Sequence, residues 1–423
     1  MIVAEIGRLR TSGGLELQRV EYVLRRDYDL RYYADKGLLN IADETCEEIE
    51  WPREEVEIFF DEVVRPSREY LLAASLVPDP DRLLLSFVWT VAYEAAVFGS
   101  PNCDAHIDSL VCDVTHAPRE FRMKLWLTGL QLNDDEILVS KALTLRRPNK
   151  RDLQIRVPAE SREPAYSGLP PFSFTCLADL RMTLSGERTA QVEADRLITI
   201  LRLFRLGSVA SSRIDTISES FYSRGSHAMR APNVIGCHVS EVSGNDAESL
   251  AALLETLGPL TPSRYGETDR PHDYISTALD WYSRSLLESG PWEARIAWAV
   301  ACLEALFGDS KTELNFRLSL RIVSLLRCLG FKPLEIKKNM SRAYDVRSKY
   351  VHGVPRKEGS AEDVRELLLA VADYARVACV VMMQLNTKFE KKAILLALDE
   401  ALIDDVRREE VQAWCSQLKV AET

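Results

Sequence analysis

The chain has 423 residues, of which 46% are hydrophobic and 28% are charged, a composition typical of a soluble globular protein large enough for two or three domains. The formal net charge of −11 excludes a protein whose whole surface attracts nucleic acid without specificity.

The start of the chain and its cysteines predict a cytoplasmic protein with no membrane contact. The first ten residues, MIVAEIGRLR, carry charges before any apolar run, unlike a secretory leader. The longest strongly apolar run, residues 83–93, is too short to span a bilayer. Nine cysteines, scattered and odd in number, indicate reduced thiols and not a disulfide framework.

Residues 1–185 are expected to form a strand-rich sensing or regulatory domain. Apolar and polar residues alternate, as in half-buried strands, at residues 55–58, 121–125 and 153–157. Turn-forming residues punctuate these runs at 133–135 and 148–149. Residues 83–98 are apolar on too many sides to distinguish a strand from a buried helix. The first 64 residues are acidic, with 8 Lys and Arg against 16 Asp and Glu.

Residues 186–269 are expected to be a helix followed by a loop-rich connector. The helix is predicted from Ser185 because apolar residues recur on one face, at Val192, Leu197, Ile200, Leu201 and Phe204. Residues 225–270 are rich in Gly, Ser, Pro and Asn, which indicates loops, with one strand expected at 235–242.

The rest of the chain has helical periodicity, so the predicted fold class is α+β with an all-α C-terminal bundle. Helices are predicted at about residues 273–288, 291–307, 313–329, 333–352 and 360–384. Helix breakers separate them, namely Ser-Gly-Pro at 289–291, then Gly330, then Gly353 with Pro355. Short connections favour a bundle over residues 270–388. One further amphipathic helix is expected at 391–418, within a C-terminal segment of residues 389–423.

The stretch YDVRSKYVHGVP, residues 344–355, ends the fourth of these helices and is strongly basic. Residues 337–357 contain a single acidic residue, Asp345, and seven basic ones: Lys337, Lys338, Arg342, Arg347, Lys349, Arg356 and Lys357. Positive charge gathered in an acidic protein indicates a surface for a phosphate-rich partner. The expected RNA-binding residues are Lys338, Arg342, Lys349, Arg356 and Lys357.

Three side chains in this stretch have the chemistry for cleaving a phosphodiester. A helix turns about 100° per residue, so Tyr344, Ser348 and His352 form one row. The long side chain of Arg347 is expected to reach across to the same cleft. A guanidinium binds phosphate through paired charged hydrogen bonds, and an imidazole moves protons near neutral pH. The candidate catalytic residues are therefore Arg347, Ser348 and His352, with neither a metal nor a cofactor expected.

The context of this stretch resembles the Apea-like HEPN domains of the HEPN superfamily. Their fingerprint in a late helix is roughly Tyr-Asp-x-Arg-Ser-x-x-x-His-Gly, which is matched here by Tyr344, Asp345, Arg347, Ser348, His352 and Gly353. Upstream, ACLEALFG at 301–308 resembles the earlier family helix with its glutamate, here Glu304. FRLSLRIVSLL at 316–326 resembles its arginine-bearing helix, here with Arg317 and Arg321. Many HEPN ribonucleases have Asn, Asp or His after the motif arginine, whereas this chain has Ser348, as the Apea-like branch does.

This resemblance covers about residues 270–388 and implies an all-α domain that pairs two-fold, so that two Arg–His motifs share one cleft. It implies a metal-independent endoribonuclease of prokaryotic anti-phage or toxin-like systems, which cleaves host or phage RNA, tRNA among them. The N-terminal region would then sense a trigger, such as a phage-encoded protein. The alternatives are a HEPN module that holds RNA or a nucleotide without cleaving it, and a phage-sensing scaffold whose partner supplies the chemistry.

The same residues also have structural interpretations. Arg347 and His352 could form a solvated helix end, where a cation is favourable by roughly 0.3–1 kcal/mol. Glu304, Arg317 and Arg321 are expected to be an internal ion-pair network that orients the helix bearing the motif, and not catalysts. Tyr344 is as suited to the core as to a site.

Two further clusters contain residue types that could form a site. The spacing C-x2-H-x5-C-x3-H has residue types suited to zinc and is formed by Cys103, His106, Cys112 and His116. Residues 107–116 also alternate as a strand would, which would point the ligands to opposite faces, so the expectation is no metal.

The basic segment 141–156 is either a second RNA-contacting surface or, as we prefer, a charged hairpin turn; its basic residues are Lys141, Arg146, Arg147, Lys150, Arg151 and Arg156.

Overall fold

The computed structural model describes residues 65–74, 80, 83–84, 86–87, 91, 102–117, 119–149, 174–184, 189–218, 221, 225–228, 238–262, 273–309, 314–354 and 361–420. The protein is α+β, which confirms the predicted fold class. It divides into two compact units. The first comprises Met1–Phe121, Met182–Thr189 and Thr216–Gly225, and the second comprises Arg122–Arg181, Ala190–Asp215 and Ser226–Thr423. These units do not follow the expected boundaries at residues 186 and 270.

Within residues 1–185, which were expected to be strand-rich, the described residues up to 117 form helices and turns, whereas the strands lie between residues 119 and 184. Helix α4 spans Arg65–Ala73 and α6 spans Cys103–Val114. The described positions within residues 83–98 are helical as well. Asn102 begins α6 because its side-chain oxygen accepts a hydrogen bond from the Ala105 N–H at 3.2 Å. The strands expected at 55–58 and 153–157 lie outside the described residues.

A six-stranded sheet has the order β3-β4-β5-β1-β6-β7, and a two-stranded sheet pairs β2 with β8 in parallel. The strand predicted at 121–125 is confirmed within β1, and the turn predicted at 133–135 separates β2 from β3. The pairs β3–β4 and β4–β5 are antiparallel. The bounds are β1 Arg119–Thr128, β2 Leu130–Leu132, β3 Glu136–Leu138, β4 Leu143–Arg146, β5 Cys176–Leu184, β6 Ala210–Ser218, β7 Gly225–Ala228 and β8 Ser240–Val242.

Gly129 connects β1 to β2 with φ of +71°. A Cβ at this position would lie 2.3 Å from the Ser208 carbonyl oxygen, so both the backbone conformation and the close approach require glycine. The left-handed backbone at Gly129 lets the chain leave the six-stranded sheet, so that β2 pairs with β8.

Helix α8, Thr189–Phe204, confirms the predicted helix, and all five residues of its expected apolar face are buried. The connector is less loop-rich than expected, because α9 forms a helix at Ala247–Leu257. A 3-10 turn at Gly244–Asp246 precedes it, and the Asp246 carboxylate accepts from the Ser243 N–H at 2.8 Å. Gly-Asn-Asp therefore starts a helix here instead of forming an isolated turn. The strand expected at 235–242 is described only as β8.

The C-terminal helices follow the prediction within a few residues as far as α14. They are α10 Tyr274–Leu287, α11 Trp292–Phe307, α12 Leu314–Arg327, α13 Pro333–Val351 and α14 Ala361–Leu385. The single helix expected at 391–418 is wrong, because α15 spans Lys391–Glu400 and α16 spans Asp405–Ser416. The Asp404 carboxylate accepts from the Val406 N–H at 2.9 Å and so begins a new helix, with neither Gly nor Pro in the break.

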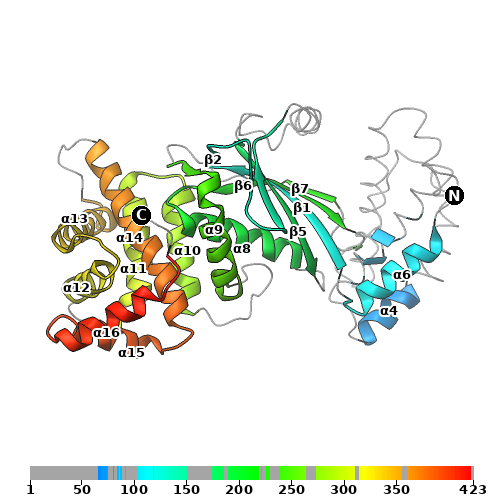
Figure 1. Ribbon diagram of the computed structural model, residues 1–423. Helices are drawn as coiled ribbons and strands as arrows, with labels where there is room; N and C mark the ends of the chain where they lie inside the picture. The colour runs from blue at the N-terminus through cyan, green and yellow to red at the C-terminus, as the bar shows by residue number, and fades with distance from the viewer. Residues whose placement is uncertain are drawn as a thin grey trace. The chain divides into compact units, whose positions relative to one another are not determined.

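Helix α11 is the centre of the bundle, packing against α10, α13 and α14 (Figure 1). Its apolar stripe of Ile296, Val300, Leu303 and Phe307 is fully buried. The buried guanidinium of Arg376 in α14 donates to the carbonyls of Leu203 and Phe204, both at 3.0 Å, at the end of α8. These bonds join α8 to the bundle and help to explain why residues on both sides of position 270 share one compact unit. No helix within the described ranges is long and apolar enough to cross a membrane.

Candidate functional site at the end of α13

The end of α13 is fixed by its local sequence. His352 is the C-cap residue, and Gly353 follows with φ of +65°. The Val354 N–H donates to the Lys349 carbonyl at 2.8 Å and the Gly353 N–H to the Tyr350 carbonyl at 3.1 Å, which is a Schellman motif. Glycine is favoured at position 353 because the left-handed conformation strains other residues. His352 is therefore an exposed residue at a capped helix end.

His352 and Ser348 lie on the exposed face of α13. Neither side chain makes a hydrogen bond or ion pair within the described part of the chain. Arg347 lies about 140° around the axis from His352, because five residues of helix rotate the side chain by about 500°. Among the described residues, Arg347, Ser348 and His352 make no hydrogen bond to one another, and the described polar contact of the Arg347 side chain is with Glu304 of α11.

Arg347 faces α11 and pairs with Glu304. A guanidinium N–H donates to the Glu304 carboxylate at 2.8 Å, with the two side chains 36% and 19% exposed. Partial burial raises the pKa of the Glu304 carboxyl above 4.5, and the positive charge of Arg347 partly offsets this increase. The guanidinium keeps further N–H donors and remains partly exposed, so Arg347 is held in place while still able to meet a phosphate.

Tyr344 lies in the core beside this pair and not on the exposed row with Ser348 and His352. Its side chain is 6% exposed, and its hydroxyl is buried with no hydrogen-bond partner among the described residues. Burial and the nearby Glu304 charge raise the pKa of Tyr344 well above its usual value. The core role of Tyr344 is the one that the structure shows.

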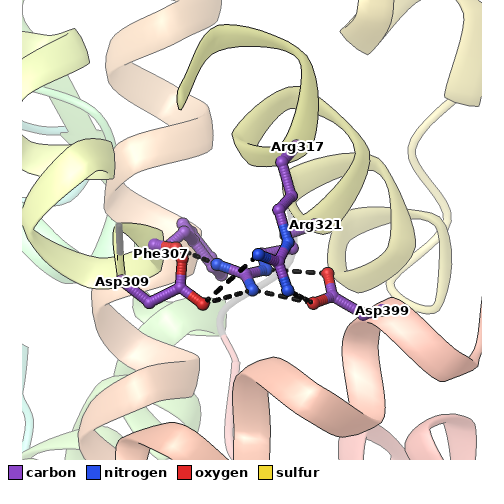
Figure 2. Close-up of polar contacts among 5 residues, drawn as sticks. All are labelled: Phe307, Asp309, Arg317, Arg321 and Asp399. Carbon is purple, nitrogen blue, oxygen red and sulfur yellow. Dashed lines mark hydrogen bonds and ion pairs between the residues drawn. The ribbon is translucent and has the colours of Figure 1, made fainter. Parts of the chain in front are cut away.

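Arg317 and Arg321 form a separate network (Figure 2). Arg321 donates to the Asp399 carboxylate at 2.7 and 2.8 Å, to Asp309 at 2.8 Å and to the Phe307 carbonyl at 2.7 Å. Arg317 pairs with Asp399 at 2.8 Å. The network joins α12 to α15 and to the end of α11. An ion-pair network was expected for Glu304, Arg317 and Arg321 together. Among the described residues Arg317 and Arg321 share Asp399, whereas Glu304 pairs separately with Arg347 of α13.

The predicted RNA-binding residues are only partly available. Lys338 and Arg342 are exposed on α13. Lys349 forms an ion pair with Asp345 at 2.6 Å, four residues earlier on the same helix. Arg356 and Lys357 lie outside the described residues. The described basic surface of α13 is therefore Lys337, Lys338 and Arg342, with Lys349 partly neutralised.

The two other clusters differ from their sequence-based descriptions. Residues 103–114 are helical in α6, so the strand predicted at residues 107–116, which was the argument against a zinc site, is wrong. Even so, no group of three or more potential metal-ligating side chains comes together in the described parts of the chain.

In the basic segment 141–156, Arg146 pairs with Asp179 at 2.7 Å and Arg147 with Asp135 at 3.1 Å. These pairs favour the charged hairpin turn, while Lys150, Arg151 and Arg156 lie outside the described residues.

Asp309 and Asp399 are the partners that sequence reasoning missed. Hydrogen bonds from the buried guanidinium of Arg321 contribute to a lowered pKa for both carboxyls, although burial of Asp399 acts in the opposite direction. Asp399 follows Arg321 by 78 residues, and nothing in the local sequence links them. The only available signal was that an arginine in the apolar stripe of α12 must find an acidic partner when buried.

A scan against protein-family models finds no match for this chain, and searches of curated proteins and of solved structures find none either. The HEPN resemblance therefore rests on the motif residues and on their order along the helices.

The Glu304 carboxyl predicts a specific pH dependence of stability. Because its pKa is raised in the folded state, the folded protein binds this proton at a pH where the unfolded chain has released it. The contribution of Glu304 to the free energy of unfolding therefore falls as the pH rises from about 4.5 through the folded pKa. Glu304→Gln keeps an oxygen acceptor for Arg347 and cannot titrate.

Urea unfolding of wild type and Glu304→Gln at about pH 4 and about pH 7 measures this effect. We expect the stability of wild type relative to the variant to be greater at the lower pH. A difference that grows as the pH rises would contradict the assignment of a raised pKa.

Proposed function

We propose that helices α10–α14 form a metal-independent HEPN endoribonuclease that cleaves host or phage RNA in anti-phage defence, with the N-terminal region sensing a trigger. The observation that supports this most is the end of α13, where a capped helix presents His352 and Ser348 to solvent while Glu304 holds Arg347 at 2.8 Å. These side chains match the family fingerprint by type and order. Incubating the protein with total RNA and mapping new 5′ ends tests the proposal directly.

Cleavage of RNA requires a general base, a general acid and a positively charged side chain that stabilises the phosphate. An imidazole takes the proton of a ribose 2′-hydroxyl, whose oxygen attacks the adjacent phosphorus. The P–O bond to the next nucleotide breaks, and a protonated imidazole gives its proton to that leaving oxygen. The guanidinium of Arg347 stabilises the negative charge that accumulates on phosphorus oxygens. The products would be a cyclic phosphate or a 3′-phosphate and a free 5′-hydroxyl.

A site built from two chains can place the imidazole of one chain opposite the guanidinium of the other. Arg347 and His352 diverge around α13, so a second copy related by a two-fold axis is the simplest way to place an imidazole opposite a guanidinium. The exposed apolar residues Tyr350, Val351 and Val354 lie beside His352 and suit a protein contact. We therefore propose a homodimer through the C-terminal bundle.

Light scattering across a range of concentrations checks this assembly. We expect a mass of twice 47.8 kDa, or a higher even multiple, under the conditions in which RNA is cleaved. Introducing a charge at this apolar position, as Val351→Glu, should shift the protein towards monomer and reduce cleavage together. Full activity in a protein that stays monomeric would rule out the two-chain site.

Cleavage should continue in EDTA. The groups that we assign to the reaction are an imidazole, a guanidinium and a hydroxyl, all of which belong to the chain, so chelation should leave the rate nearly unchanged. The test compares RNA cleavage rates with and without EDTA and identifies the end groups of the products. Activity that disappears in EDTA and returns with magnesium would require a different mechanism.

A second candidate is a module that binds RNA or a nucleotide without cleaving it. The observation in its favour is that Arg347 is already occupied by Glu304. The two candidates differ in one readout: both predict RNA binding that weakens with salt, but only the nuclease produces new 5′ ends.

A further inference from the structure

Three polar side chains follow one another from the core to the surface where α11 packs against α13. Tyr344 is 6% exposed, whereas the side chains of Glu304 and Arg347 are 19% and 36% exposed. Tyr344 and Arg347 are three residues apart on α13, so they are neighbours on one side of this helix. Glu304 reaches the same side from α11, because it accepts the 2.8 Å hydrogen bond from Arg347. The three side chains therefore share one helix interface.

The Tyr344 hydroxyl is the polar group of this interface that lacks a partner. It is buried and makes no hydrogen bond to any residue that the structure describes. Burying a donor without an acceptor costs free energy that a hydrogen bond would otherwise recover. Phenylalanine would occupy nearly the same space without this cost. Core packing alone therefore does not explain a tyrosine at position 344.

Two other buried tyrosines of the bundle provide a contrast. The Tyr282 hydroxyl donates to the Arg202 carbonyl at 2.8 Å, and the Tyr374 hydroxyl accepts from the Asn339 side chain at 3.1 Å. Both are as deeply buried as Tyr344. Buried hydroxyls in this bundle are thus satisfied elsewhere, and Tyr344 differs from them in having its hydroxyl beside an ion pair.

Glu304 has acceptor capacity to spare. Within the described part of the chain its carboxylate accepts one hydrogen bond, from Arg347, whereas an ionised carboxylate can accept about four. Burial and the nearby charge of Glu304 raise the pKa of Tyr344, so its hydroxyl keeps the proton and remains a donor. A donor without an acceptor thus lies beside an acceptor with unused lone pairs.

We propose that Tyr344 is a positioning residue that acts on Arg347 through Glu304, an inference that rests on the proposed role of Arg347 at a phosphate. A phosphate that meets the exposed side of the guanidinium competes with Glu304 for its positive charge. The Glu304 carboxylate then accepts a hydrogen bond from the Tyr344 hydroxyl, which stabilises the negative charge that Arg347 no longer fully neutralises. Arg347 stays in place while its charge acts mainly on the phosphate.

The first experiment follows tyrosine absorption in the near ultraviolet, where inorganic phosphate, the probe, is transparent. A tyrosine hydroxyl that begins to donate to a carboxylate absorbs at longer wavelength. We expect phosphate to produce this shift in the full chain, and we expect Tyr344→Phe and Glu304→Gln each to abolish it. Tyr374→Phe should retain the shift. No shift in wild type, or an unchanged shift in Tyr344→Phe, would overturn the proposal.

The melting temperature separates this role from a purely structural one. Tyr344→Phe should not lower it, because the hydroxyl makes no hydrogen bond among the described residues. Tyr374→Phe is the matched control and should lower it, because the bond from Asn339 is lost. A decrease in Tyr344→Phe as large as that in Tyr374→Phe would show that the Tyr344 hydroxyl already has a structural partner, which would contradict the proposal.

RNA cleavage provides the kinetic readout. Tyr344→Phe should lower kcat roughly tenfold with KM nearly unchanged, because Arg347 acts on the charge of the transition state while most RNA affinity comes from other phosphates. In the Glu304→Gln background the same change should have little further effect, because the amide carries no charge to stabilise. Independent, multiplicative effects of the two substitutions would overturn the proposal. The phosphate-induced shift requires no cleavage, so failure of the nuclease assignment and failure of the Tyr344 role give different results.

Discussion

His352→Ala should lower the rate of RNA cleavage by roughly 10²–10⁴-fold while leaving the fold intact, because the imidazole is the group assigned to proton transfer. His352 is an exposed C-cap residue whose backbone conformation alanine can also adopt, so the free energy of unfolding should change by no more than about 0.5 kcal/mol. Cleavage rates and melting temperatures of the purified variant, with its oligomeric state checked, make the measurement. Wild-type cleavage by this variant would show that residues 344–355 are a helix end and not an active site.

Arg347 requires a different design, because its ion pair gives it a structural role as well. Arg347→Ala leaves Glu304 without its partner, at a cost of about 1–3 kcal/mol, so a loss of activity alone would be ambiguous. Arg347→Lys keeps a positive charge near Glu304 but loses the planar fork that binds phosphate. We expect Arg347→Lys to remain folded and to cleave poorly. The double variant Arg347→Lys, His352→Ala should be barely slower than His352→Ala, because both groups act on one transition state. Ser348→Ala should lower the cleavage rate less than His352→Ala does. Arg342→Ala, on the same helix, should weaken RNA binding only modestly.

Arg321→Met should destabilise the protein by about 3–5 kcal/mol, the largest effect on stability that we expect from a single change. The Arg321 side chain is 2% exposed and donates to two carboxylates and to the Phe307 carbonyl. Methionine keeps most of the aliphatic stem, so the loss should come from unpaired carboxylates and not from a cavity. Guanidinium chloride unfolding at neutral pH measures the effect.

Arg317→Ala is the matched control, because Arg317 pairs with the same Asp399 but is 49% exposed. We expect it to cost only about 0–1 kcal/mol. A similar small cost for Arg321→Met would show that the network contributes no more than a surface ion pair.

The same network has an acid dependence with a definite sign. The pKa values of Asp309 and Asp399 are lowered in the folded state, so their contribution to stability is fully present above their ordinary value of 3.8. It is lost as the pH falls through the folded pKa values. The difference in stability between wild type and Arg321→Met should therefore shrink in acid.

Much of the C-terminal fold could be read from local sequence, because helix starts and stops are encoded within a few residues. Gly353 is an example: a glycine after His352 predicts the end of α13, and the structure ends it there through hydrogen bonds that span five residues. The helix boundaries predicted from the sequence were wrong where no such signal exists. The break between α15 and α16 contains neither Gly nor Pro, and Gly-Asn-Asp before α9 has the composition of a turn while starting a helix.

The candidate site divides in the same way. Residue types, helix positions and the exposed end of α13 followed from the sequence by itself, since they depend on 3.6-residue periodicity and on helix capping. Which arginine meets which acid was decided only by tertiary packing. Glu304 lies 43 residues from Arg347, and Asp399 lies 78 residues from Arg321. The packing of α11 against α13 places one pair together, and the packing of α12 against α15 places the other. An ion pair forms over a few ångströms in space, and periodicity within a helix carries no information about which distant helix will supply the partner.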